Sequence, residues 1–120
     1  MERGLEVYVV DDNKDAADSL RDVILRLGHN ATSLYDGAAA LQAARQAPPD
    51  CVLLDVAMSG MNGLELARAL RAEFGDDVVL VAVTGAPEDD EVVAKTFETV
   101  DHYFVKPVSL DKLMRLLPHA

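Results

Sequence analysis

The chain has 120 residues, half of them apolar, with 11 basic and 21 acidic side chains and a formal net charge of −10. This length fits one domain with a single hydrophobic core, and the apolar content excludes a disordered segment. The acidic balance argues against nonspecific binding to nucleic acid or to an anionic membrane. No apolar run approaches the roughly 20 residues of a membrane span. No signal peptide is visible at residues 1–10, and the single cysteine cannot form an internal disulfide. We therefore expect one cytoplasmic domain over residues 1–120.

Short apolar segments alternate with segments of helical periodicity. The apolar segments predict strands at residues 5–10, 31–35, 50–54, 78–83 and 102–105. A helix is expected after each strand. The first helix has Asn13 as its N-cap and ends near Gly28. The next two are expected at about residues 38–46 and 63–75, and the last two begin at about residue 88 and at Ser109. Five rounds of strand and helix with short connections predict an α/β fold with a parallel sheet and helices on both faces.

Two expectations concern burial. Apolar residues at i, i+3, i+4 and i+7 of the last helix predict one buried face made of Leu110, Leu113, Met114 and Leu117. Histidines 29, 102 and 119 are scattered and are expected at the surface, and none lies on a long helical pattern suited to a phosphohistidine.

Polar side chains follow four of the predicted strands: Asp11 and Asp12, Asp55, Thr84, and Lys106. The carboxyl ends of parallel strands meet at one edge of a sheet, so these groups should converge. Two unit charges ~4 Å apart cost about 4 kcal/mol at an effective dielectric of ~20, so three carboxylates need a counter-charge. Lys106 supplies one positive charge. A Mg²⁺ ion, which prefers oxygen ligands and retains water, would supply two.

These residue types suit phosphoryl transfer. Asp55 is the candidate nucleophile, which would form an aspartyl phosphate beside Mg²⁺. Lys106 would pair with one phosphoryl oxygen, and Thr84 would donate a hydrogen bond to another. Movement of Thr84 would make the loop after its strand a switch. A simpler alternative is that Asp55 only caps the next helix or begins a polar loop.

The chain resembles the receiver domain of two-component response regulators over essentially its full length. Five motifs in order carry the resemblance: Val9-Val10-Asp11-Asp12-Asn13, Leu53-Leu54-Asp55-Val56-Ala57-Met58, Gly60-Met61-Asn62-Gly63, Val83-Thr84-Gly85 and Tyr103-Phe104-Val105-Lys106-Pro107. The sequences of residues 11–17 and 101–103 look most like those of receivers attached to hybrid sensor histidine kinases. One departure is Ser59, which stands where the family usually has proline, so we expect a more mobile loop there.

The resemblance implies a flavodoxin-like (βα)5 fold with strand order 2-1-3-4-5. It implies that Asp55 accepts a phosphoryl group from a histidine kinase or a histidine phosphotransfer protein. It assigns Asp11, Asp12, Asp55 and the backbone carbonyl of Ala57 to Mg²⁺. It also makes Tyr103 an aromatic switch coupled to Thr84, makes the bond before Pro107 a cis peptide, and makes the fourth helix, fifth strand and fifth helix the readout face. We expect a monomer or weak homodimer that does not itself bind nucleic acid or membrane; the kinase, the stimulus and the downstream partner stay open.

Three other functions compete with this interpretation. A phosphatase of the haloacid dehalogenase type needs a second acid two residues after the nucleophile, where this chain has Ala57, and a substrate cap. A nucleotide or flavin binder needs a Gly-rich phosphate loop after the first strand, where Asp11 and Asp12 would repel phosphates. A purely structural domain with an idle site is less expected, because all five site residues are present.

Overall fold

Five strands alternate with five helices in a computed structural model that describes residues 4–85 and 91–117. The strands are β1 (Glu6–Val10), β2 (Asn30–Leu34), β3 (Cys51–Asp55), β4 (Val79–Thr84) and β5 (His102–Val105). The helices are α1 (Lys14–Arg26), α2 (Gly37–Gln46), α3 (Gly63–Phe74), α4 (Glu91–Thr99) and α5 (Leu110–Leu116). The expected acidic helix start at residues 88–90 lies outside the described residues. No helix of the described ranges is long and apolar enough to cross a bilayer.

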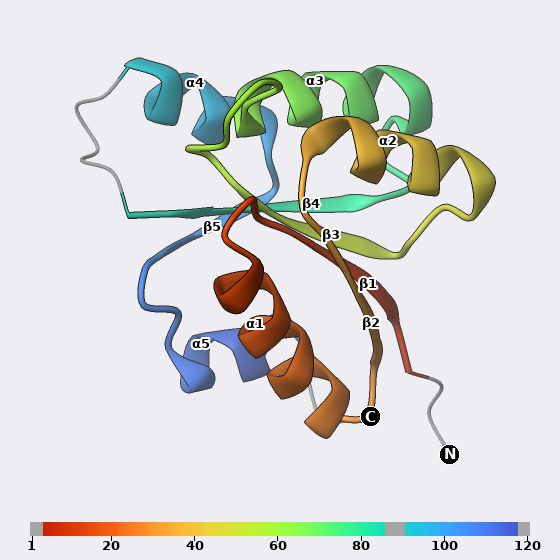
Figure 1. Ribbon diagram of the computed structural model, residues 1–120, viewed down its shortest axis with the longest axis vertical. Coiled ribbons are helices and arrows are strands. Elements are labelled where there is room, and N and C mark those ends of the chain that lie inside the picture. Colours follow the sequence, from red (N-terminus) through yellow and green to blue (C-terminus); the bar gives the residue numbers. More distant parts are fainter. Residues whose placement is uncertain (1–3, 86–90, 118–120) are drawn as a thin grey trace.

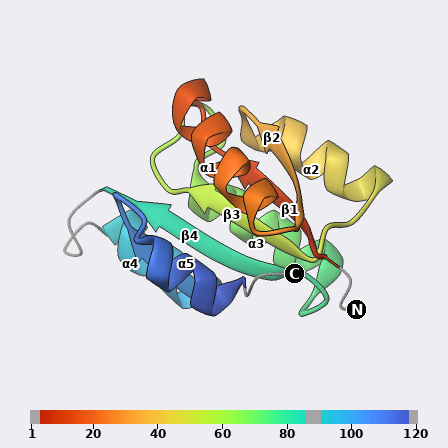
Figure 2. The ribbon, with the colours of Figure 1, turned by 90° about the horizontal axis from the view of Figure 1, so that it is seen from below.

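All five strands pair in parallel in the order β2-β1-β3-β4-β5. Helices α2, α3 and α4 cover one face of this sheet, and α1 and α5 cover the other (Figures 1 and 2). A parallel pair needs a long crossover, and here a helix supplies each one. The flavodoxin-like α/β fold predicted from the sequence is therefore confirmed.

The central strand β3 is buried along its whole length because helices cover both faces of the sheet. Side chains alternate across a strand. Val52 and Leu54 accordingly pack in the cluster under α2 and α3, while Cys51 and Leu53 pack in the cluster under α1 and α5. The strand then ends at Asp55, which places one buried carboxylate at the carboxyl edge of the sheet.

Local hydrogen bonds explain where the helices begin. The Asn13 and Ser109 side chains accept from the backbone amides of Ala16 and Lys112, so both expected N-caps are in place. Helix α3 begins with a capping box between Asn62 and Glu65. The cap of α3 is therefore Asn62, and the alternative in which Asp55 serves only as a helix cap is wrong.

Two expectations about burial are corrected by the structure. Leu113 of α5 and Leu117 at its C-cap are buried, but Leu110 is 54% and Met114 is 38% exposed. Leu113 and Leu117 pack in the core cluster under α1 and α5, whereas Leu110 and Met114 are not part of that cluster, so only part of the apolar face finds a partner. His29 is buried rather than exposed, and its Nδ1 accepts a hydrogen bond from the backbone amide of Leu5 at 3.0 Å. A backbone donor just before β1 requires a partner, which apolar periodicity does not reveal.

We predict that native Cys51 resists alkylation. Burial, with smaller contributions from the charges of Asp101 and Asp50, raises the pKa of its thiol to about 12. Only the thiolate is reactive, so iodoacetamide should label the folded protein far more slowly than the denatured protein near pH 8. Intact mass spectrometry over time measures both rates. Equal rates in the two states would show that the core around β3 is open.

Candidate functional site

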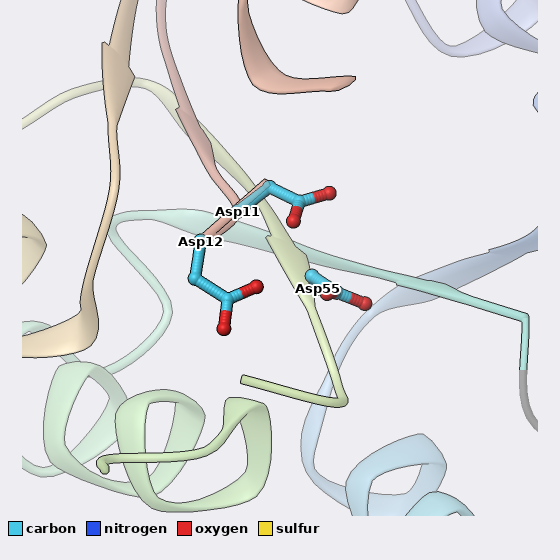
Figure 3. A group of neighbouring side chains, drawn as sticks. All are labelled: Asp11, Asp12 and Asp55. Carbon is cyan, nitrogen blue, oxygen red and sulfur yellow. The ribbon is translucent and has the colours of Figure 1, made fainter. Parts of the chain in front are cut away.

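Three carboxylates converge at the ends of the two central strands β1 and β3. Ligand oxygens of Asp11, Asp12 and Asp55 all lie within 4.8 Å of one another (Figure 3). The strand register explains this proximity, because Val10 pairs with Leu54 and the residue that follows each of them is an aspartate. Asp55 is only 6% exposed, and Asp11 is equally buried, whereas Asp12 faces solvent.

One cation bridges two of these carboxylates. Lys106 Nζ lies 3.1 Å from Asp11 Oδ2 and 3.5 Å from Asp55 Oδ1. Lys106 follows the edge strand β5, and its side chain reaches past the end of β4 to the end of β3. Its backbone amide donates to the carbonyl of Thr84 at 2.8 Å, which holds the start of that side chain at the sheet edge. Three carboxylates and one ammonium leave the cluster with a formal charge of −2.

The protonation equilibria of the site reflect this excess of negative charge. Burial raises the pKa of Asp55, the charge of Asp11 raises it further, and Lys106 offsets only part of the effect. Burial alone would lower the pKa of Lys106, but its hydrogen bond to Asp11 and the charge of Asp55 outweigh burial and raise it. The lysine therefore stays protonated, while the ionised form of Asp55 is destabilised.

An apolar cavity of about 510 Å³ adjoins the carboxylates between α1 and the segment after β5. Leu20 and Val23 of α1, Leu53 of β3 and Val108 contribute to its lining, together with Asp11, Asp55 and Lys106. Apolar walls beside a carboxylate reduce its solvation. The cavity therefore gives a structural reason why burial is the largest influence on the pKa of Asp55.

Gly63 permits the close approach of α3 to the phosphoacceptor candidate. A Cβ added to Gly63 would lie 2.6 Å from the carbonyl oxygen of Asp55 and 2.7 Å from Cα of Val56. Real Cβ atoms do not come so close to backbone, so only glycine fits at the first position of α3. The sequence shows this glycine in the loop after Asp55, but its contact with Asp55 is visible only in the structure.

The two candidate switch residues occupy different environments. Thr84 is buried at the end of β4, one residue after Val83, which pairs with Asp55. Tyr103 is 47% exposed on β5, and its ring stacks on Phe97 of α4 with centroids 3.9 Å apart and planes 15° apart. The structure thus brings Thr84 to the acidic edge and leaves Tyr103 outside it. Phe97 is a residue that the sequence analysis missed, although it follows Val93 by four positions in the same helix.

The remaining predicted residues lie beside the cluster. The backbone amide of Ala57 donates to Asp55 Oδ1 at 3.4 Å. The peptide bond between Lys106 and Pro107 is cis. The donor set of three carboxylates, with a residual charge of −2 after Lys106 is counted, fits a hard divalent cation such as Mg²⁺.

Comparison with known proteins identifies the family of this chain and agrees with the fold. The family model of the response regulator receiver domain matches residues 7–117. The chain is 36% identical over 108 residues to the DNA-binding response regulator MtrA of Mycobacterium tuberculosis, an alignment that covers 90% of this chain and 46% of that protein. It is 34% identical over 110 residues to the response regulator MprA of Mycobacterium avium, covering 92% of this chain and 48% of that protein.

Solved structures show the same architecture. A CheY-like receiver domain from Methylobacillus flagellatus superposes with a TM-score of 0.83 at 27% identity, covering 95% of this chain and 96% of that one. The receiver domain of a modulated diguanylate cyclase from Desulfovibrio desulfuricans superposes with a TM-score of 0.83 at 28% identity, covering 94% of this chain and 90% of that one. The chain spans about half the length of the curated relatives that it matches. The family match and the two relatives establish that the chain belongs to the response regulator receiver domain family of two-component systems.

Proposed function

We propose that this domain accepts a phosphoryl group at Asp55, in a Mg²⁺-dependent reaction, from a phosphohistidine on a histidine kinase or histidine phosphotransfer protein. The observation that carries the proposal is a buried carboxylate inside a group of three, with Lys106 in contact with two of them. We treat residues 1–120 as one receiver domain. Its location is cytoplasmic in this proposal, because the donor draws its phosphoryl group from ATP.

In the proposed reaction a carboxylate oxygen of Asp55 attacks phosphorus while the bond from phosphorus to the histidine nitrogen breaks. The bonding electron pair stays with that nitrogen, and a proton on the other ring nitrogen of the phosphohistidine lets the histidine leave as neutral imidazole. Bound Mg²⁺, held by Asp11, Asp12, Asp55 and the backbone carbonyl of Ala57, would offset the charge on the carboxylates and on the phosphoryl oxygens. The Lys106 ammonium is close enough to Asp55 to exchange this contact for one with a phosphoryl oxygen.

The proposed signal runs from Thr84 to the face formed by α4, β5 and α5. The Thr84 hydroxyl would donate to a phosphoryl oxygen, and its displacement would alter the packing of Tyr103 on Phe97. The large exposed apolar side chains Tyr103, Val105, Leu110 and Met114 on β5 and α5 support this face as the site of readout. We assign no nucleic-acid binding to this domain itself, because its net charge is −10.

Acetyl phosphate with Mg²⁺ tests the phosphoacceptor assignment. We expect intact mass spectrometry to show one added phosphoryl group on the wild type and none on Asp55→Asn, because the amide lacks the nucleophilic oxygen. Removing the metal with EDTA should abolish the addition. The matched control Asp76→Asn changes an aspartate whose side chain is fully exposed and should be labelled like the wild type. Addition of a phosphoryl group to Asp55→Asn, or no addition to the wild type, would refute the assignment.

Asp55→Asn should also stabilise the metal-free protein at neutral pH, because the amide removes a buried charge that lies beside Asp11. The pKa of Asp55 is raised in the folded protein, so ionisation of this group costs stability above that pKa. The gain should disappear as the pH falls below the pKa of an unfolded aspartate, about 4, where Asp55 is protonated in both states. Urea denaturation of both proteins near pH 7 and below pH 4 measures the difference. A less stable Asp55→Asn at neutral pH would contradict the electrostatic account.

A further inference from the structure

Asp12 is held from the loop after β3. Its Oδ2 accepts a hydrogen bond from the backbone amide of Ser59 at 3.0 Å and a second from the Ser59 hydroxyl at 3.2 Å. These bonds join residues 47 positions apart in the chain, at the ends of two neighbouring strands. The loop expected to be more mobile because it lacks proline is therefore tied to the acidic edge.

The three carboxylates are held by different partners. Asp11 accepts from the backbone amide of Asn13 at 2.9 Å and pairs with Lys106, and Asp55 also lies beside that lysine. Within the described ranges, Asp12 makes no ion pair with Lys106, and both of its hydrogen bonds to another segment come from Ser59. Asp11 and Asp12 also project in different directions from the end of β1 (Figure 3).

We propose that Ser59 is a positioning residue that fixes the Asp12 carboxylate for the divalent cation at the phosphoryl-transfer site. This inference rests on the proposed function. Asp12 is exposed and lies among like charges, so without a tether its side chain would gain rotamer freedom by turning toward solvent. Ser59 engages Oδ2 and leaves Oδ1 available as a ligand. Hydrogen-bonded partners of this kind typically orient metal ligands and increase metal affinity.

Both hydrogen bonds that hold Asp12 from another segment depend on the residue at position 59. A proline at this position would have neither the amide hydrogen nor the hydroxyl. The contact is thus a consequence of the residue that this chain carries at position 59.

Direct Mg²⁺ binding tests the inference without reference to phosphorylation. Isothermal titration calorimetry with MgCl₂ on EDTA-treated full-length protein gives the dissociation constants of wild type, Ser59→Ala, Ser59→Thr and Ser33→Ala. Ser59→Ala loses the hydroxyl bond and keeps the amide bond to Asp12, so we expect it to weaken binding by about tenfold, the lower end of the effect of removing a partner of this kind. Ser59→Thr keeps both donors and adds a methyl group at an exposed position, so it should bind like the wild type. Ser33→Ala removes a hydroxyl from β2 and should also bind like the wild type.

Each other outcome overturns the inference in an identifiable way. Binding by Ser59→Ala within about twofold of the wild type would show that the hydroxyl does not position Asp12, and tighter binding would show that it competes with the cation. Equal losses in Ser59→Ala and Ser33→Ala would indicate a general effect on the fold. If the wild type itself bound no Mg²⁺, the metal dependence of the proposed function would fail as well. If the wild type bound Mg²⁺ and Ser59→Ala bound it equally well, that function would stand without the inference.

Discussion

Repulsion among three carboxylates at one edge of the sheet is the constraint on which the site depends. Lys106 neutralises one unit of this charge through contacts to Asp11 and Asp55, but burial and, next, the charge of Asp11 still raise the pKa of Asp55. A fold optimised only for stability would not keep such a group, since each uncompensated charge costs free energy. This cost in stability is expected at a functional site in which a cation and a phosphoryl group complete the cluster.

The fold creates this constraint through strand adjacency. Because β1 and β3 are neighbours in a parallel sheet, their carboxyl ends lie side by side and bring Asp11 next to Asp55. Gly63 allows α3 to begin directly against the backbone of Asp55. The apolar cavity beside α1 keeps that carboxylate poorly solvated on one side. The packing around the central strand β3 therefore determines the electrostatic environment of Asp55, its last residue.

Much of this arrangement could be predicted from the sequence, because it depends on periodicity and strand ends. The alternation of strands and helices determined the layers, and the polar residues after the strands identified Asp11, Asp12, Asp55 and Lys106 as neighbours. What could not be predicted depends on the path of loops and on which side of a helix finds a partner. The contact of Ser59 with Asp12, the stacking of Tyr103 on Phe97 and the burial of His29 are of this kind. The exposure of Leu110 also belongs here, because helical periodicity does not say which apolar residues of a helix find a packing partner.

The central claim is that the acidic edge requires a divalent cation, and the effect of Mg²⁺ on folding stability tests it most directly. Urea denaturation of the wild type and of Asp12→Asn, each with and without Mg²⁺, gives the four free energies of unfolding. The account predicts that Mg²⁺ at about 100 times its dissociation constant stabilises the wild type by about 2.7 kcal/mol. It predicts a much smaller gain at the same Mg²⁺ concentration for Asp12→Asn, which lacks one charged ligand. Equal stability of the wild type with and without Mg²⁺ would contradict the account.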